Sequence, residues 1–206
     1  MKKFLFCIYF FLCSCSLPIT YSDTHQQKNP NSNLLPALNT KISVPNLRAA
    51  FSDATDDEGK PDYNLRNVMA DDAVNIFERE VEENITLGEG EKRGYISFRV
   101  TYVQLDNSTG LRALSMATLG LLNAVGLPMD KFTQTMEVEI EIMNKKRDVV
   151  KRYTQVVETS AYRAYYWGYK RKDINRKVSA DNVKEALRII REKINKDASE
   201  ILERLK

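Results

Sequence analysis

The strongest constraint on the fold is an alternating stretch in the second half of the chain. Across residues 136–142, aliphatic side chains alternate strictly with glutamates. A period of two places four aliphatic residues on one face of a strand and three carboxylates on the other. Such a strand needs a sheet with one buried face and one face in water, which is typical of antiparallel sheets. A polar turn at 144–148 leads to a second strand at 149–159, in which Lys151 and Arg152 are expected to lie opposite the glutamates.

Apolar periodicity predicts further elements. A helix is expected from Leu65 to Asn84, with Asn64 as its cap, because apolar residues recur there every three to four positions. Short strands are expected at 41–44 and 95–103, the second of which would bury the face made of Ile96, Phe98, Val100 and Tyr102.

The last predicted element is a long helix from Ala180 to Lys206, capped by Ser179. Its apolar residues follow a spacing close to a heptad repeat. This seam can pack across the sheet. Alternatively, the end beyond Asp197 pairs with a second copy of the chain or with a partner helix.

Together these elements predict an α+β fold, in which an antiparallel sheet carries helices on one face and the C-terminal helix is long. Residues 41–206 are expected to form one domain, which is the number that a chain of this length supports.

The first residues have the order of a secretory signal. Lys2 and Lys3 precede an apolar run at 4–12, which is too short to span a bilayer. The run ends in Leu12-Cys13-Ser14-Cys15, which resembles the lipobox of bacterial lipoproteins. The resemblance implies that residues 1–14 are removed, that Cys15 carries lipid, and that residues 15–40 form a flexible linker. The alternative is that Cys15 is unmodified and the protein is simply secreted.

Two stretches are candidates for contact with a membrane or a partner. Residues 113–129 carry no charge, and they can form a buried helix or hairpin at one end of the sheet, an exposed apolar surface, or a membrane-spanning helix. The residues proposed for contact there are Leu119, Leu121 and Leu122. The second stretch combines aromatic and basic residues, which either close the sheet edge or form an interface, namely Tyr165, Tyr166, Trp167, Tyr169, Lys170 and Arg171.

Composition argues against several function classes. The single histidine, His25, lies in the expected linker, and no cysteine follows Cys15, so we expect no enzyme activity, no cofactor and no metal. The acidic stretch at 52–62 lacks the order of a calcium-binding loop, which favours a solvated loop. Loss of Lys2 and Lys3 would lower the formal net charge from +3 to +1, and we therefore expect no nucleic-acid partner.

The order of elements and the TQTMEVEIEI hairpin resemble the small Gram-negative envelope lipoproteins of the YajG-like kind. The first hypothesis is a non-enzymatic lipoprotein on the periplasmic side of the outer membrane, an accessory or assembly factor. It would bind another envelope component, with an envelope protein as the expected partner, through the aromatic-basic stretch and residues 113–129. A second hypothesis is a carrier of lipid or acyl chains, with a pocket gated by residues 113–129. A third is a carbohydrate-cleaving enzyme that uses carboxylates.

Overall fold

The computed structural model describes residues 34–206 apart from residues 57, 88–89, 108 and 165–169. Four strands form one sheet in the order β1-β2-β3-β4, and their bounds are Asn39–Ile42, Gly94–Asn107, Asp130–Asn144 and Val149–Arg163. β1 runs parallel to β2, whereas the other two pairs are antiparallel. The predicted α+β class is confirmed, with a sheet that is mostly antiparallel.

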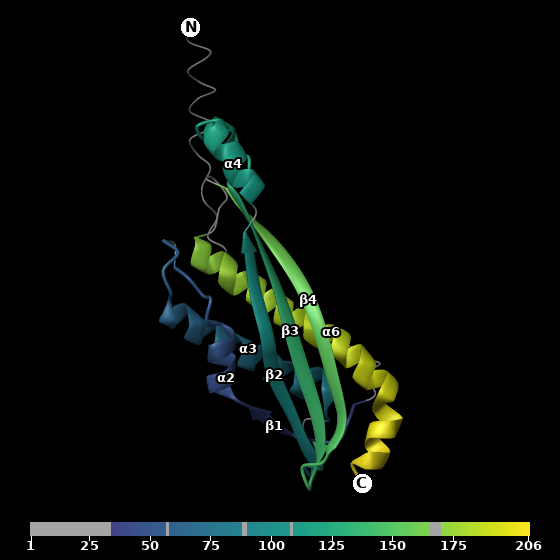
Figure 1. The fold of residues 1–206 in the computed structure, drawn as a ribbon. Helices are drawn as coiled ribbons and strands as arrows, with labels where there is room; N and C mark the ends of the chain where they lie inside the picture. The colour runs from purple at the N-terminus through teal and green to yellow at the C-terminus, as the bar shows by residue number, and fades with distance from the viewer. Residues whose placement is uncertain (1–33, 57, 88–89, 108, 165–169) are drawn as a thin grey trace, which may run out of the picture.

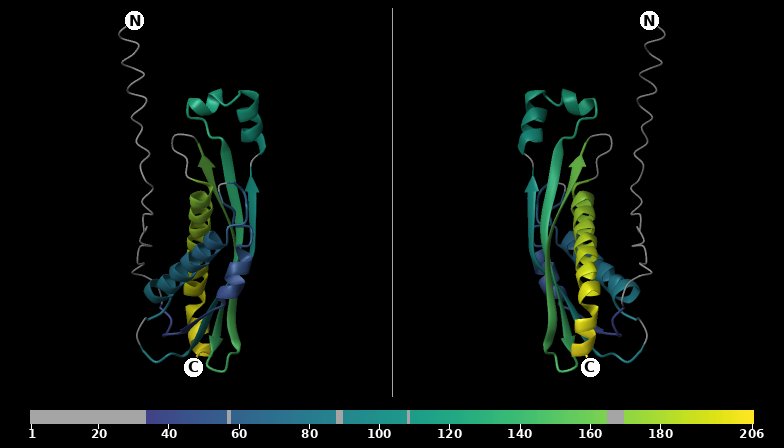
Figure 2. Two further views of the ribbon diagram at one scale, coloured as in Figure 1. Left: turned by 90° about the vertical axis from the view of Figure 1, so that its left-hand side faces the viewer. Right: turned by 90° about the vertical axis from the view of Figure 1, so that its right-hand side faces the viewer.

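Two helices cover one face of this sheet. α3 (Tyr63–Glu80) and α6 (Arg171–Arg204) lie on the same side of the strands, as Figures 1 and 2 show. The Phe77 ring of α3 stacks on Phe98 of β2 with 4.8 Å between centroids. The aliphatic face predicted for β3 is fully buried beneath the helices, at Met136, Val138, Ile140 and Ile142.

α6 begins nine residues before the position expected from the sequence. Ser179 does not cap it but is buried within the helix, where its hydroxyl hydrogen-bonds to the Gln134 amide of β3 at 2.8 and 3.0 Å. The helix packs across the sheet. Every apolar position of the predicted seam is buried within the chain, including the part beyond Asp197, at Val183, Leu187, Ile190, Ile194, Ala198, Ile201 and Leu205.

α3 starts with a different cap from the one expected. The Asp62 carboxylate accepts from the backbone N–H groups of Asn64 and Leu65 at 2.9 and 3.0 Å. A π-helical turn at Val81–Ile85 follows the helix. Just before this turn, the buried Glu80 carboxylate receives a hydrogen bond at 2.9 Å from Arg191 of α6. Burial raises the pKa of Glu80, and the nearby Arg191 charge opposes that rise.

One residue of β2 lies on the face opposite to the predicted one. The pairing with β3 shifts between Val100 and Tyr102, so that Tyr102 is 49% exposed and Val103 packs against the core instead. An extra residue in one strand reverses the side-chain alternation beyond it.

The basic residues of β4 divide between the two faces of the sheet. Arg152 lies opposite Glu141 and donates to its carboxylate at 2.7 Å, as predicted. Lys151 lies on the helix-covered face and instead pairs with Asp197 and Glu200 of α6 at 3.3 and 2.8 Å. Adjacent residues on a strand point to opposite faces, and therefore only one of the two can reach the glutamates.

The folded domain begins earlier than the boundary predicted at residue 41. Leu35 is fully buried, and its backbone pairs with Ile85 and Leu87 at 2.8 Å in each case. Leu38 is buried as well. The short strand predicted at 41–44 is instead β1 at Asn39–Ile42, because Val44 and Pro45 belong to the first turn of α2 (Val44–Ala50), where proline's missing N–H is not needed.

We predict that Ile140→Asn destabilises the protein by about 3–5 kcal/mol, because it leaves a cavity and an unpaired amide under α6. The matched change Val156→Asn, on the open face of β4 where Val156 is 52% exposed, is expected to cost less than about 1 kcal/mol. Urea denaturation of both variants measures the difference. Equal losses would contradict the assignment of the two faces.

Candidate functional site

Two short helices project from one end of the sheet and form its most exposed apolar surface. α4 (Thr109–Ala117) and α5 (Leu121–Ala124) join β2 to β3, and we call residues 109–129 the tip. Figures 1 and 2 show the tip beyond the ends of the strands and away from α3. The opposite end of the sheet, where β2 starts and the turn between β3 and β4 lies, is the base.

The apolar side chains of the tip are not buried. Leu119 is 91% exposed and Leu121 is 71% exposed, whereas Leu122 is half-buried. The other exposed apolar residues are Leu114, Met116, Val125 and Leu127. A buried helical hairpin is therefore the wrong interpretation of this segment. Within the described ranges, no helix is long and apolar enough to cross a bilayer.

One polar side chain of the tip is buried inside it. Asn123 is 2% exposed, accepts a hydrogen bond from the Ser115 hydroxyl, and donates through Nδ2 to the Leu127 carbonyl at 3.2 Å. The Thr118 hydroxyl donates to the Leu114 carbonyl at 3.0 Å. The Ser115–Asn123 hydrogen bond thus joins the two helices while large aliphatic groups face outward, the reverse of an ordinary soluble hairpin.

The most exposed leucine also has an unfavourable backbone conformation. Leu119 has φ 49°, in the left-handed region, and it precedes Gly120 at φ 77°. A left-handed conformation costs a non-glycine residue roughly 1–2 kcal/mol, which glycine and asparagine largely avoid. Leu119 therefore adds nothing to local stability through its backbone or through burial.

A buried carboxylate fixes the tip to the sheet. Asp130, the first residue of β3, is fully buried and accepts from Arg112 Nε at 3.1 Å and from Arg112 Nη2 at 2.7 Å. Arg163 of β4 adds a longer contact at 3.4 Å. The hydrogen bond to Asp130 raises the pKa of the Arg112 guanidinium. The two charged residues that bound the uncharged stretch thus clamp its ends together.

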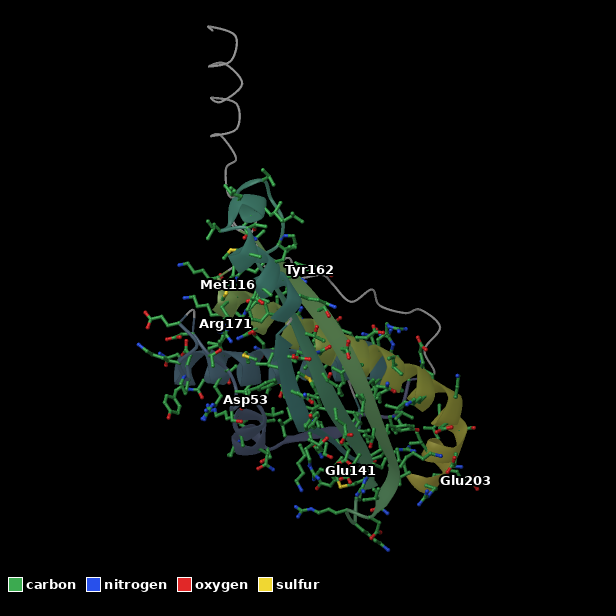
Figure 3. The ribbon with its side chains drawn as sticks, turned by 45° about the horizontal axis from the view of Figure 1, so that its top comes forward. Asp53, Met116, Glu141, Tyr162, Arg171 and Glu203 are labelled. Atoms are coloured by element: carbon green, nitrogen blue, oxygen red, sulfur yellow. The ribbon has the colours of Figure 1, made fainter. Side chains whose placement is uncertain are left out.

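Basic and aromatic groups surround the junction of the tip with the sheet. The Lys131 ammonium lies 6.0 Å from the ring centroid of Tyr162, which is 46% exposed. Lys170, at the N-cap of α6, is exposed, and the Arg171 guanidinium lies 5.6 Å from the Phe132 ring. Figure 3 shows Met116, Tyr162 and Arg171 at the same end of the molecule, far from Glu203.

Part of the predicted site lies outside the described residues. This applies to Cys15 and to the aromatic residues Tyr165, Tyr166, Trp167 and Tyr169. The chain on either side of these aromatics is described: Ala164 is buried at the end of β4, and Lys170 begins the turn into α6. Ala164 and Lys170 themselves lie at the same end of the sheet as the tip.

The described chain shows little that fits a carrier or a metal site. Two cavities near the base share Lys41 and Met143, and their volumes are about 110 and 220 Å³. Neither includes residues of the tip. Apart from the undescribed positions, no group of three or more His, Cys, Asp or Glu side chains could hold a metal ion.

Comparisons with known proteins add little. No protein-family model and no curated protein matches the sequence. The structure is similar to a crystal structure described as "a putative lipoprotein from Caulobacter crescentus CB15", with a TM-score of 0.42 and 11% sequence identity, over 79% of this chain and 90% of that chain. Agreement at that level does not establish a common fold.

The sequence analysis identified the leucines of the tip. It did not identify the Arg112–Asp130 ion pair or the buried Asn123. Arg112 and Asp130 were visible as the two charges that bound an uncharged run. Their pairing is long-range, however, and it depends on β2 and β3 forming a hairpin that brings the two residues together.

We predict that Leu119→Gly leaves the tip as stable as before or stabilises it by up to about 1 kcal/mol, because glycine adopts φ 49° freely. The same change at Leu121, the first residue of α5, is expected to destabilise the tip by up to about 1 kcal/mol. Native-state hydrogen exchange of the amides in α4 and α5 measures both effects. A clear loss of protection in Leu119→Gly would show that the leucine side chain supports the tip.

Proposed function

We propose that this protein is a non-enzymatic lipoprotein of the cell envelope, which uses the tip to bind another envelope component. The observation that carries the proposal is the reversed arrangement of the tip, in which the Asn123 amide is buried and hydrogen-bonded while large aliphatic side chains lie in water. An exposed apolar surface of this kind is unfavourable unless something covers it. An internally hydrogen-bonded scaffold presents such a surface in a fixed shape.

The lipoprotein part of the proposal comes from the N-terminal sequence. Leu12-Cys13-Ser14-Cys15 follows a basic and then apolar leader, and Cys15 would be the single cysteine of the mature chain. Two or more acyl chains on that cysteine would give a stable anchor. We propose the outer membrane as the site and its periplasmic side as the orientation of the domain.

Basic residues next to the tip belong to the proposed surface. Lys131 and Lys170 lie at the same end as the tip, and the aromatic segment at 165–169 joins β4 to Lys170. Aromatic and basic groups beside an aliphatic patch suit an interface with a protein or with lipid headgroups. We find no comparable support for an acyl-chain carrier.

The anchor is tested by replacing the proposed lipid acceptor. Cys15→Ala is expected to abolish incorporation of a tagged fatty acid, whereas Cys13→Ala, at a free position of the lipobox, is expected to keep it. Gel fluorescence of both variants expressed in a Gram-negative host measures the outcome. Label retained in Cys15→Ala would rule out this attachment site.

The binding surface is tested by photocrosslinking in intact cells. A photoreactive residue at Leu119 or Leu121 is expected to give crosslinked envelope products, because both side chains are more than two-thirds exposed on the tip. The same residue at Leu87, which is 54% exposed at the base, serves as the control. Equal crosslinking at all three positions would argue against a dedicated surface at the tip.

A further inference from the structure

The tip and the first described residues of the chain lie at opposite ends of the domain. Leu35 pairs with Ile85 and Leu87, and the Ala37 carbonyl accepts from Arg93, immediately before β2 starts at the base. The chain that precedes Leu34 therefore joins the domain at the base. β2 runs from there along the whole sheet and ends at the tip.

The sheet is longer than the mean span expected for the linker. β3 has 15 residues and spans roughly 50 Å, and the tip extends beyond it. Leu34 lies nineteen positions after Cys15. For the flexible linker that the sequence predicts here, the mean span is roughly 25 Å, about half the length of the sheet. A domain held at its base by such a linker presents the tip away from the anchoring membrane.

The chemistry of the tip favours a lipid surface over a protein partner. Its exposed apolar side chains are aliphatic or methionine, whereas protein–protein hot spots are rich in tryptophan, tyrosine and arginine. No charged group lies between Arg112 and Asp130, so insertion of the tip would not desolvate a charge.

The residues at the edge of the tip complement anionic headgroups. Arg112 and Lys131 flank the uncharged stretch, and the side chain of Arg112 is 42% exposed although it pairs with Asp130. The Asp130 carboxylate is buried and adds no exposed negative charge. Tyr162, half exposed beside Lys131, occupies the position of an interfacial aromatic residue.

We propose that the tip binds the surface of a second, anionic phospholipid bilayer that faces the membrane holding the N-terminal lipid. This deepens the proposed function and rests on it, because it names the bound component as phospholipid. The aliphatic tip enters the headgroup boundary, and the flanking basic residues contact the phosphates.

The experiment uses the full-length lipidated protein reconstituted into phosphatidylcholine vesicles. A second population of fluorescent vesicles, containing phosphatidylglycerol, is added, and its capture is measured by co-flotation. We expect capture that weakens with added salt and is at least tenfold lower for second vesicles of phosphatidylcholine alone. The double variant Leu119→Asn, Leu121→Asn is expected to lose at least tenfold of the capture.

The matched control is Leu87→Asn, an identical change at an exposed leucine of the base. It is expected to capture vesicles like the wild type. Asparagine tolerates the conformation of Leu119, and hydrogen exchange of α4 verifies that the double variant keeps its tip. Undiminished capture by the double variant, or an equal loss in Leu87→Asn, would overturn the proposal. Absence of capture by the wild type would also overturn it, and crosslinking at Leu119 in cells would then still support a protein partner.

Discussion

The fold depends on the burial of one face of β3 beneath α6. The four aliphatic side chains of that face are fully buried, and each contributes roughly 1.5–3 kcal/mol relative to an exposed position. β3 is also the strand that pairs with both β2 and β4 over nearly its whole length. Its orientation therefore fixes the faces of both neighbours, since a slip by one residue would turn the glutamates toward the helices. The parallel strand β1 and helix α2 are added to a sheet that is already determined.

The helix-facing row of β3 changes character toward the tip. Beyond Met136 it continues with Gln134, Phe132 and Asp130, all of which are buried. Gln134 bonds to Ser179 and Asn182 of α6, and Asp130 bonds to the two arginines of the clamp. Toward the tip, this row of β3 is therefore held by hydrogen bonds to specific partners as well as by apolar packing. These hydrogen bonds allow the tip to be attached to the end of the sheet without an extension of the hydrophobic core.

Local periodicity predicted those parts of the fold in which one face is uniformly apolar. The strand at 136–142 and the seam of the terminal helix were correct for that reason. The errors arise where a distant partner overrides a local preference. Ser179 has the character of a helix cap, yet Gln134 satisfies its hydroxyl inside the helix. Tyr102 follows a bulge that no local pattern revealed. The sequence could not show whether the tip is buried or exposed, because an uncharged, largely apolar segment is compatible with both.

The core and the tip are stabilised by different interactions, so that residues of the tip can be substituted without destabilising the core. The main cluster of buried apolar residues contains none from the tip, which is held instead by the Asp130 clamp and by hydrogen bonds around Asn123. Distant and independent sites contribute additively to stability, and so changes at the exposed leucines leave the core unaffected. Leu119 combines nearly complete exposure with a left-handed backbone, and stability alone explains neither property. Because Leu119 is unfavourable in both respects, we include it in the contact surface proposed for the tip.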